Sequence, residues 1–326
     1  MEAAQCPHGD RYPVIEGIPV LLTGELAPTH PYRDATLAAV GHLAPVPSSN
    51  GSSQAAEVDA FVQDEILRTN GNLYRSLIGR LPRYPIPQLR LPAGAGRTLL
   101  DVGSNWGRWT FAAARAGYRA VGLDPWIQAA RAGQRVARQL GLDVAFVVGD
   151  ARRLPFSGAT FDACFSYSVL QHFDKSGVRE SLTEMSRVTT PGGTVMVQMA
   201  NAFGIRQAYN RLRQRFRNDL NPFRVHYWTP RELERTFGEV VGPSLLRVDG
   251  YFSLNPQAAD LDLLPARYRW IVRASEALRR MAGLLPPLRF LADSLYVESS
   301  NSRMPGDDRC DGPWYQGPSG SPPGSG

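Results

Sequence analysis

Between residues 97 and 200, short apolar runs alternate with longer stretches of helical character. The runs are TLLDV, RAVGLD, VAFVVGD, FDACFSYS and GTVMVQM, and each has the length of a single strand. Alternation of this kind is typical of an α/β fold in which crossover helices connect the strands of a parallel sheet. After residue 200, LLRVDGYFSL and DSLYVESS predict two more strands, with a helical insert at 257–290 between them.

The first run leads into a glycine turn, TLLDVGSNWGRWTF, at residues 98–111. Asp101 lies at the end of the run, and Gly103 and Gly107 follow it. Glycine has no Cβ atom, so the backbone can turn sharply here and approach a ligand closely. An acid in this turn would repel a pyrophosphate, which prefers a bare helix N-terminus. The turn suits a ligand that carries an amino group and a sulfonium.

Two further runs also end in aspartate. Asp124 ends RAVGLD, and Asp150 ends VAFVVGD, directly before Ala151. The ends of parallel strands meet at one edge of an open sheet, where such sheets bind ligands. Asp124 can accept from both hydroxyls of a ribose, and Asp150 from an adenine amino group. Each aspartate alone is explained as a helix cap, but three in series beside the glycine turn favour a ligand site.

The same segments resemble the motifs of class I S-adenosylmethionine-dependent methyltransferases. DVGSNWGRW is similar to the first motif, GLDP to the second, GDARRLPF to the third and FDACFSYSVLQHF to the fourth, while VTTPGGTVMVQM is similar to the segment that leads into the fifth strand. Asn105 stands where the family usually has glycine. The resemblance implies a Rossmann-like, open, mostly parallel seven-stranded sheet with helices on both faces, an antiparallel last strand and helical cap inserts.

The resemblance also implies which residues hold S-adenosyl-L-methionine. Asp101 and Gly103 would lie near its methionine part, and Ser166 beside the methyl-bearing sulfur. The expected cofactor-binding residues come from the strand ends and from a helical lid: Asp101, Gly103, Ser104, Asn105, Gly107, Asp124, Pro125, Asp150, Ala151, Ser166 and Tyr74. Asn70 and Asn72 are further lid candidates, although an Asn-Gly turn between packed helices explains the same stretch.

Methyl transfer from a sulfonium requires an aligned nucleophile and the exclusion of water. A hydroxyl nucleophile also benefits from a general base, and His172 in SVLQHF is the candidate because imidazole titrates near neutral pH. The alternative is that His172 only packs against a loop. The candidate substrate-binding residues are Tyr167, Gln171, His226 and Tyr227.

Two features of the sequence limit the chemical class of the methyl acceptor. FSYS stands where an Asn/Asp-Pro-Pro-aromatic motif would support methylation of planar amino groups. Cys164 lies inside an expected strand rather than in a loop, which argues against a cysteine nucleophile. We therefore expect methyl transfer to an oxygen or carbon of a small-molecule, sugar or lipid-linked acceptor.

Outside residues 97–200, motifs and composition divide the chain into segments of different kinds. The N-terminal segment resembles half of a zinc ribbon, but a zinc site needs four ligands and only Cys6 and His8 remain, so no metal is expected. The sequence TPRE predicts a helix start with a capping box at Thr229 and Glu232. The expected division is a degenerate zinc-ribbon-like β segment at 1–24, a flexible linker at 25–56, a helical lid at 57–96, the methyltransferase domain at 97–300 with cap inserts at 201–228 and 257–290, and a disordered tail at 301–326.

The formal net charge of +6 rests almost wholly on arginine, since Lys175 is the single lysine. Arginines crowd both cap inserts, which favours an anionic acceptor or a peripheral contact with an anionic membrane. A solvated helix face explains these arginines as well.

Two other functions stay open as alternatives, a tRNA methyltransferase and a non-catalytic protein that retains the cofactor fold. The sequence contains no RNA-binding module with paired aromatics, so nucleic acid is not the favoured partner. A run of 18 apolar residues and a secretory leader are also missing from the sequence, and we expect a soluble, cytoplasmic protein without a transmembrane segment.

Overall fold

The computed structural model of the chain describes most of the expected domain and parts of the N-terminal region. The described residues are 2–5, 11–22, 31–42, 58–69, 72–206, 209, 225–252 and 257–303. The tail from residue 304 and most of the predicted insert 201–228 lie outside them, as do Cys6, His8, Asn70 and Cys310.

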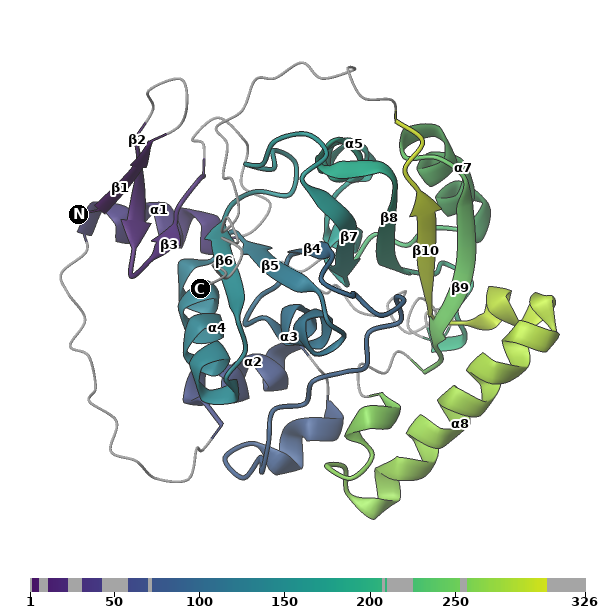
Figure 1. Cartoon of the computed structure of the whole chain (residues 1–326). Helices are drawn as coiled ribbons and strands as arrows, with labels where there is room; N and C mark the ends of the chain where they lie inside the picture. The colour runs from purple at the N-terminus through teal and green to yellow at the C-terminus, as the bar shows by residue number, and fades with distance from the viewer. Residues whose placement is uncertain are drawn as a thin grey trace, which may run out of the picture.

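A seven-stranded sheet forms the centre of the structure (Figure 1). Its strand order is β6-β5-β4-β7-β8-β10-β9. The five strands that the alternating pattern predicts pair in parallel, while β10 runs antiparallel to both of its neighbours. The strands are β4 (Thr98–Val102), β5 (Arg119–Asp124), β6 (Val144–Val148), β7 (Phe161–Tyr167), β8 (Thr189–Ala200), β9 (Ser244–Gly250) and β10 (Ser294–Ser300). The predicted fold class is confirmed.

Helices cover both faces of this sheet. On one face, Phe111 and Val136 pack in a core with Phe146, and on the other Leu182 and Phe237 pack with Leu100. The first face carries α2 (Ala60–Thr69), α3 (Arg108–Arg115) and α4 (Ile127–Leu140), and the second carries α5 (Lys175–Val188) and α7 (Pro230–Val240). The predicted capping box at the start of α7 is confirmed, since the Thr229 side chain accepts from the Glu232 backbone and Glu232 from that of Thr229.

The N-terminal strands form a small sheet of their own. It comprises β1 (Glu2–Gln5), β2 (Arg11–Ile15) and β3 (Ile18–Pro19). The chain beyond β3 reaches the edge of the main sheet, where Leu21 N donates to the Val148 carbonyl at 2.8 Å.

The range 25–56, predicted as a flexible linker, contains helix α1 (Pro31–His42), so this prediction is wrong for the described part of that range. The physical reason is a specific contact with the main domain. The buried Thr36 Oγ1 donates to the Pro125 carbonyl at 2.9 Å and accepts from Ile127 N at 3.1 Å. Thr36 therefore satisfies a backbone donor at the start of α4 that has no partner inside the helix.

The segment 57–96, predicted as a helical lid, is helical only in its first part. Helix α2 is followed by the 3-10 helix η1 (Asn72–Leu77), and the chain has neither helix nor strand between Leu77 and Thr98. The predicted helical insert at 257–290 contains η3 (Ala258–Asp260), α8 (Ala266–Leu284) and η4 (Pro286–Leu291). Figure 1 shows α8 beside β9 at the outer side of the molecule.

Three glycines surround the Phe146 ring of β6. A Cβ atom would lie 2.7 Å from the ring at Gly107, 2.9 Å at Gly122 and 2.5 Å at Gly133. These glycines come from the turn before α3, from β5 and from α4. Because none of them has a side chain, the turn and both elements can pack directly against the aromatic ring.

We predict that Gly133→Ala destabilises the protein by about 1–3 kcal/mol, because the added methyl group overpacks the Phe146 ring. Helix propensity alone would favour alanine by about 1 kcal/mol. The matched control is Gly238→Ala in α7, where a Cβ atom would meet nothing within 4 Å and a small stabilisation is expected. Urea unfolding of the two variants measures both effects, and equal stabilisation by the two would contradict the packing argument.

Candidate functional site

The glycine turn is fixed to the neighbouring strand by its backbone. Gly103 N and Ser104 N both donate to the Leu123 carbonyl, at 2.7 and 2.9 Å. Gly103 and Gly107 have φ values of 80° and 90°. Glycine adopts this positive-φ region far more readily than residues with a side chain do. A Cβ atom at Gly103 would collide with the Val169 side chain. The turn therefore requires glycine for its conformation and for the space around it.

Asp101 is buried under this turn. Thr110 Oγ1 donates to its Oδ2 at 2.7 Å. Burial raises the pKa of Asp101 to about 7, against the hydrogen bond from Thr110, and the nearby charge of Asp124 adds to the rise. The carboxyl group is thus held in a site that favours its neutral form.

Asp124 lies at the end of β5, facing the turn. Its two carboxylate oxygens accept from Asn105 N at 2.9 Å and from Trp126 N at 3.0 Å. Burial raises its pKa to about 6, while these two hydrogen bonds oppose the rise. A carboxylate offers roughly four acceptor positions, so Asp124 can still accept hydrogen bonds from a ligand.

Asp150 is already strongly engaged. The backbone N and Nε of Arg152 donate to its Oδ1 at 2.9 and 3.0 Å, and Arg152 Nη2 donates to its Oδ2 at 2.8 Å. An adenine amino group would have to share this carboxylate with the guanidinium. Ala151, the neighbour in the predicted adenine pair, is buried, and Pro125 contributes its carbonyl to Thr36.

Glu65 belongs to this cluster, although the sequence analysis did not identify it. It comes from α2 and is buried, and its Oε2 accepts from Asn105 Nδ2 at 2.9 Å. Its charge contributes to the raised pKa of Asp124. Asn105, with a φ of 48°, therefore contacts two carboxylates, one by its backbone and one by its side chain. No local pattern marks Glu65, because its partner lies in a distant turn.

Tyr74 has different neighbours from those expected. It is fully buried, near the ion pair in which Arg108 Nη2 lies 3.1 Å from Asp260 Oδ2. Burial raises the pKa of Tyr74 well above its ordinary value, so the phenol stays protonated. Asn72 begins η1.

Two predicted site residues end β7, and their side chains differ in role. Ser166 is fully buried, and its hydroxyl donates to the Val102 carbonyl at 2.8 Å. The Tyr167 hydroxyl donates to Asp249 Oδ2 at 2.9 Å, and its ring centroid lies 4.5 Å from that of Trp109. Burial, with the charge of Asp249, raises the pKa of Tyr167 well above its ordinary value.

The remaining candidates gather directly after β7. Gln171 and His172 form the 3-10 helix η2 (Leu170–His172), and His226 N donates to the Gln171 carbonyl at 2.7 Å. The structure therefore brings the end of the insert 201–228 to the segment that carries His172. His172, His226 and Tyr227 are all partly buried.

Cys164 lies inside β7 and is fully buried. Burial raises the pKa of its thiol to about 12, which keeps the sulfur protonated and poorly nucleophilic. The helices described by the structure include none that is long and apolar enough to cross a membrane.

Part of the chain is similar to known methyltransferases. Residues 99–193 match a family model described as a methyltransferase domain. A protein of Mycobacterium avium named "Uncharacterized methyltransferase" is 38% identical over 106 residues, which cover 32% of this chain and 40% of the relative. The demethylmenaquinone methyltransferase of Renibacterium salmoninarum is 34% identical over 102 residues, covering 31% and 40%. The chain thus spans about two fifths of the length of the curated relatives it matches.

Among solved structures, the magnesium protoporphyrin IX methyltransferase of Synechocystis PCC 6803 is similar with a TM-score of 0.45 and 13% sequence identity. This similarity covers 77% of this chain and 90% of that protein.

The raised pKa of Asp101 predicts how stability changes with pH. The folded protein binds this proton more tightly than the unfolded chain, so the free energy of unfolding falls as pH rises from about 4 to about 7. Asp101→Asn cannot ionise and should lose this part of the pH dependence, which is on the order of a few kcal/mol.

Urea unfolding at about pH 5 and about pH 8 measures the difference. Asp143→Asn is the matched control, since Asp143 is exposed between α4 and β6. If wild type and Asp101→Asn lose stability in parallel while the control behaves as wild type, Asp101 does not titrate as described.

Proposed function

We propose that the chain transfers a methyl group from S-adenosyl-L-methionine to an oxygen or carbon of an acceptor molecule. The match of residues 99–193 to a methyltransferase domain supports this proposal. The observation that carries this proposal is the position of Asp101 and Asp124 on either side of one glycine turn, with Asp150 at the end of the next strand. Three carboxyl groups at one sheet edge suit a ligand with cationic and hydroxyl groups.

The residues at this edge fit S-adenosyl-L-methionine, the cofactor of such domains. Asp124 keeps acceptor positions for ribose hydroxyls after its two backbone hydrogen bonds. The Ser104 hydroxyl is buried and has no hydrogen-bond partner among the described residues, which leaves a donor for a ligand. Asp101 and the backbone of Gly103 would face the methionine part. In this arrangement the adenine amino group would share Asp150 with Arg152.

The bound cofactor supplies a methyl group activated by a sulfonium. The task of the protein is then to align the acceptor and to exclude water. His172 is proposed as the base for a hydroxyl acceptor, because it lies directly after the strand end that carries Ser166 and Tyr167. Gln171, His226 and Tyr227 are proposed to position that acceptor.

A small molecule is the proposed acceptor class, and sugar or lipid-linked molecules belong to the same proposal. The name of the relative from Renibacterium salmoninarum, a demethylmenaquinone methyltransferase, supports a small molecule. The half-buried Tyr167, whose hydroxyl donates to Asp249, supports a polar group in the acceptor. Arginines of the cap favour an acceptor with negative charge.

Calorimetric titration of S-adenosylmethionine and S-adenosylhomocysteine into the full chain tests the cofactor site. We expect micromolar binding that Asp124→Asn weakens at least tenfold, about 1.4 kcal/mol. The amide replaces one acceptor oxygen with an NH2 donor, so fewer acceptor positions remain for ribose hydroxyls beside the two backbone N–H groups. Asp143→Asn makes the same chemical change at an exposed position and should leave the affinity unchanged. A folded wild type that binds neither compound would overturn the proposed function.

Removal of the proposed base tests the chemistry separately. With a hydroxyl acceptor, His172→Gln should lower kcat by about 10²–10⁴-fold while the affinity for S-adenosylhomocysteine stays that of wild type. Wild type should also lose turnover at acidic pH, and the variant should lose this pH dependence. Unchanged kcat in His172→Gln would assign the histidine a packing role.

A further inference from the structure

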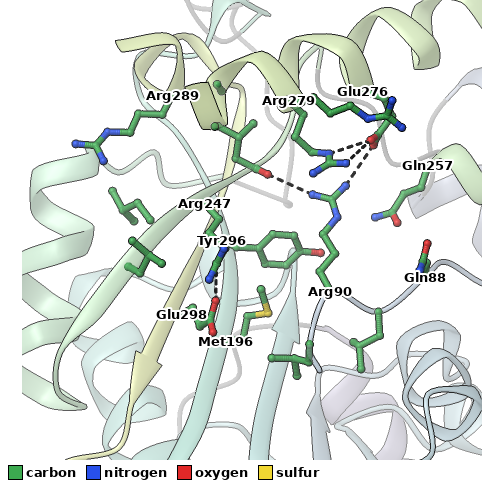
Figure 2. Close-up of a pocket in the computed structure, with 18 of the residues that line it drawn as sticks. Gln88, Arg90, Met196, Arg247, Gln257, Glu276, Arg279, Arg289, Tyr296 and Glu298 are labelled. Carbon is green, nitrogen blue, oxygen red and sulfur yellow. Dashed lines mark hydrogen bonds and ion pairs between the residues drawn. The ribbon is translucent and has the colours of Figure 1, made fainter. Parts of the chain in front are cut away.

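A cavity of about 870 Å³ lies beneath α8, and Asp101, Asp124 and Asp150 do not line it. We call it the α8 cavity. The strands β8, β9 and β10 form one wall, α8 and η4 form another, and the segment around Arg90 borders the cavity (Figure 2). Its volume falls within the range of roughly 300–1,000 Å³ that is common for small-molecule sites.

Two buried polar groups of this cavity lack a protein partner. Tyr296 is 0% exposed and Gln257 is 8% exposed. Neither the Tyr296 hydroxyl nor Gln257 Nε2 finds a hydrogen-bond partner among the described residues. In Figure 2 both groups point toward the space beside Arg90. Since buried polar groups are almost always satisfied, these two are placed to bind a polar group that enters the cavity.

The side chains that line the α8 cavity carry a net positive charge. Glu276 is shared between Arg90 and Arg279, at 3.4 and 2.7 Å, and Glu298 pairs with Arg247 at 2.6 Å. Among the residues that the structure describes, neither Arg280 nor Arg289 has a carboxylate partner. The lining contains five arginines and these two glutamates, and Asp249 pairs with Arg90 at 3.3 Å. Positive charges still outnumber negative ones, which favours an anion.

Most of the remaining lining is apolar, and it continues to the surface. Leu89, Leu91, Met196, Leu246 and Val248 provide apolar walls. Gly283 and Pro286 line the cavity at the end of α8, and the residues between them, Leu284 and Leu285, are 83% and 53% exposed. An apolar chain could therefore lie in the cavity and leave it along an apolar rim.

We propose that the α8 cavity binds an amphipathic anion, a molecule with an apolar chain and one phosphate or carboxylate group. The apolar walls hold the chain. The arginines bind the anion, and the Tyr296 hydroxyl and the Gln257 amide donate to its oxygens. This proposal does not depend on methyl transfer, because none of the residues that line the cavity belongs to the group Asp101, Asp124 and Asp150.

Calorimetric titration of the full chain with decyl phosphate, decanol and inorganic phosphate tests the proposal. We expect micromolar binding of decyl phosphate, and binding at least tenfold weaker for both of the other probes, since each lacks one half of the ligand. Failure of decyl phosphate to bind, or equal binding of decanol, would overturn it. Titration of S-adenosylhomocysteine into the same sample reports the cofactor site independently.

Matched variants place the binding in the cavity. Arg280→Gln removes a lining charge, and Arg273→Gln removes an exposed charge of the same helix that does not line the cavity. We expect Arg280→Gln to weaken decyl phosphate binding at least fivefold and Arg273→Gln to change it less than twofold. Tyr296→Phe deletes only the unpartnered hydroxyl and should also weaken binding. Equal effects of the two arginine variants would mean a nonspecific response to charge and would overturn the assignment.

Vesicles identify the source of the ligand. If the anion is taken from a bilayer, wild type should sediment with vesicles of phosphatidylcholine and phosphatidylglycerol but not with phosphatidylcholine alone, and Arg280→Gln should sediment less. If the protein binds decyl phosphate without sedimenting with either vesicle, the ligand is a free amphiphile. Both results support the cavity as a binding site and differ only in where its ligand comes from.

Discussion

Two hydrogen bonds to one carbonyl group determine the geometry of the sheet edge that carries Asp101 and Asp124. Gly103 N and Ser104 N both donate to the Leu123 carbonyl, which fixes the turn after β4 against the end of β5. As a consequence, the carboxyl groups of Asp101 and Asp124 come close enough for the charge of one to raise the pKa of the other. The approach of α3 and α4 to the same strands depends on the glycines around Phe146, because any side chain there would collide with the ring. The backbone geometry of the turn therefore determines how close the two carboxyl groups lie and how each affects the charge of the other.

In the free protein, these buried carboxyl groups lower the stability of the folded state near neutral pH. Asp101 and Asp124 have raised pKa values because burial removes water from their carboxyl groups. The charge of Glu65, which also pairs with Arg68 at 2.6 Å, adds to the rise in the pKa of Asp124. Such a concentration of buried acids is expected where function outweighs stability. A cationic ligand would lower this cost, because its charge favours the ionised carboxylates. The same groups that weaken the free protein would thus strengthen binding of the proposed cofactor.

A second polar network joins this edge to the cap. The Tyr167 hydroxyl donates to Asp249, and Arg90 contacts Asp249 on one side and Glu276 of α8 on the other. Helix α8 buries only Val272 and Ser275, so much of its position depends on such polar contacts and on its neighbours η3 and η4. A ligand in the α8 cavity would touch Arg90 and therefore the partner of Tyr167. The cap and the proposed reaction site are connected through side chains that leave no pattern in the sequence.

The sequence by itself determined where strands and helices follow one another along the chain. The spacing of apolar residues and the turn residues between them are local properties. It also placed Asp101, Asp124 and Asp150 at strand ends, and the edge of a parallel sheet brings such ends together. Only the tertiary structure decided what these residues contact. Glu65 reaches Asn105 across 40 positions of the chain, and α1 packs its Thr36 against Pro125 in a stretch that reads as a linker. The Arg152 guanidinium donates two hydrogen bonds to the Asp150 carboxylate, and this contact depends on side-chain geometry that the order of residues does not specify. Local sequence patterns determine which segments form helices and strands. The partners of each buried polar group are determined by long-range packing, because packing depends on the whole chain at once.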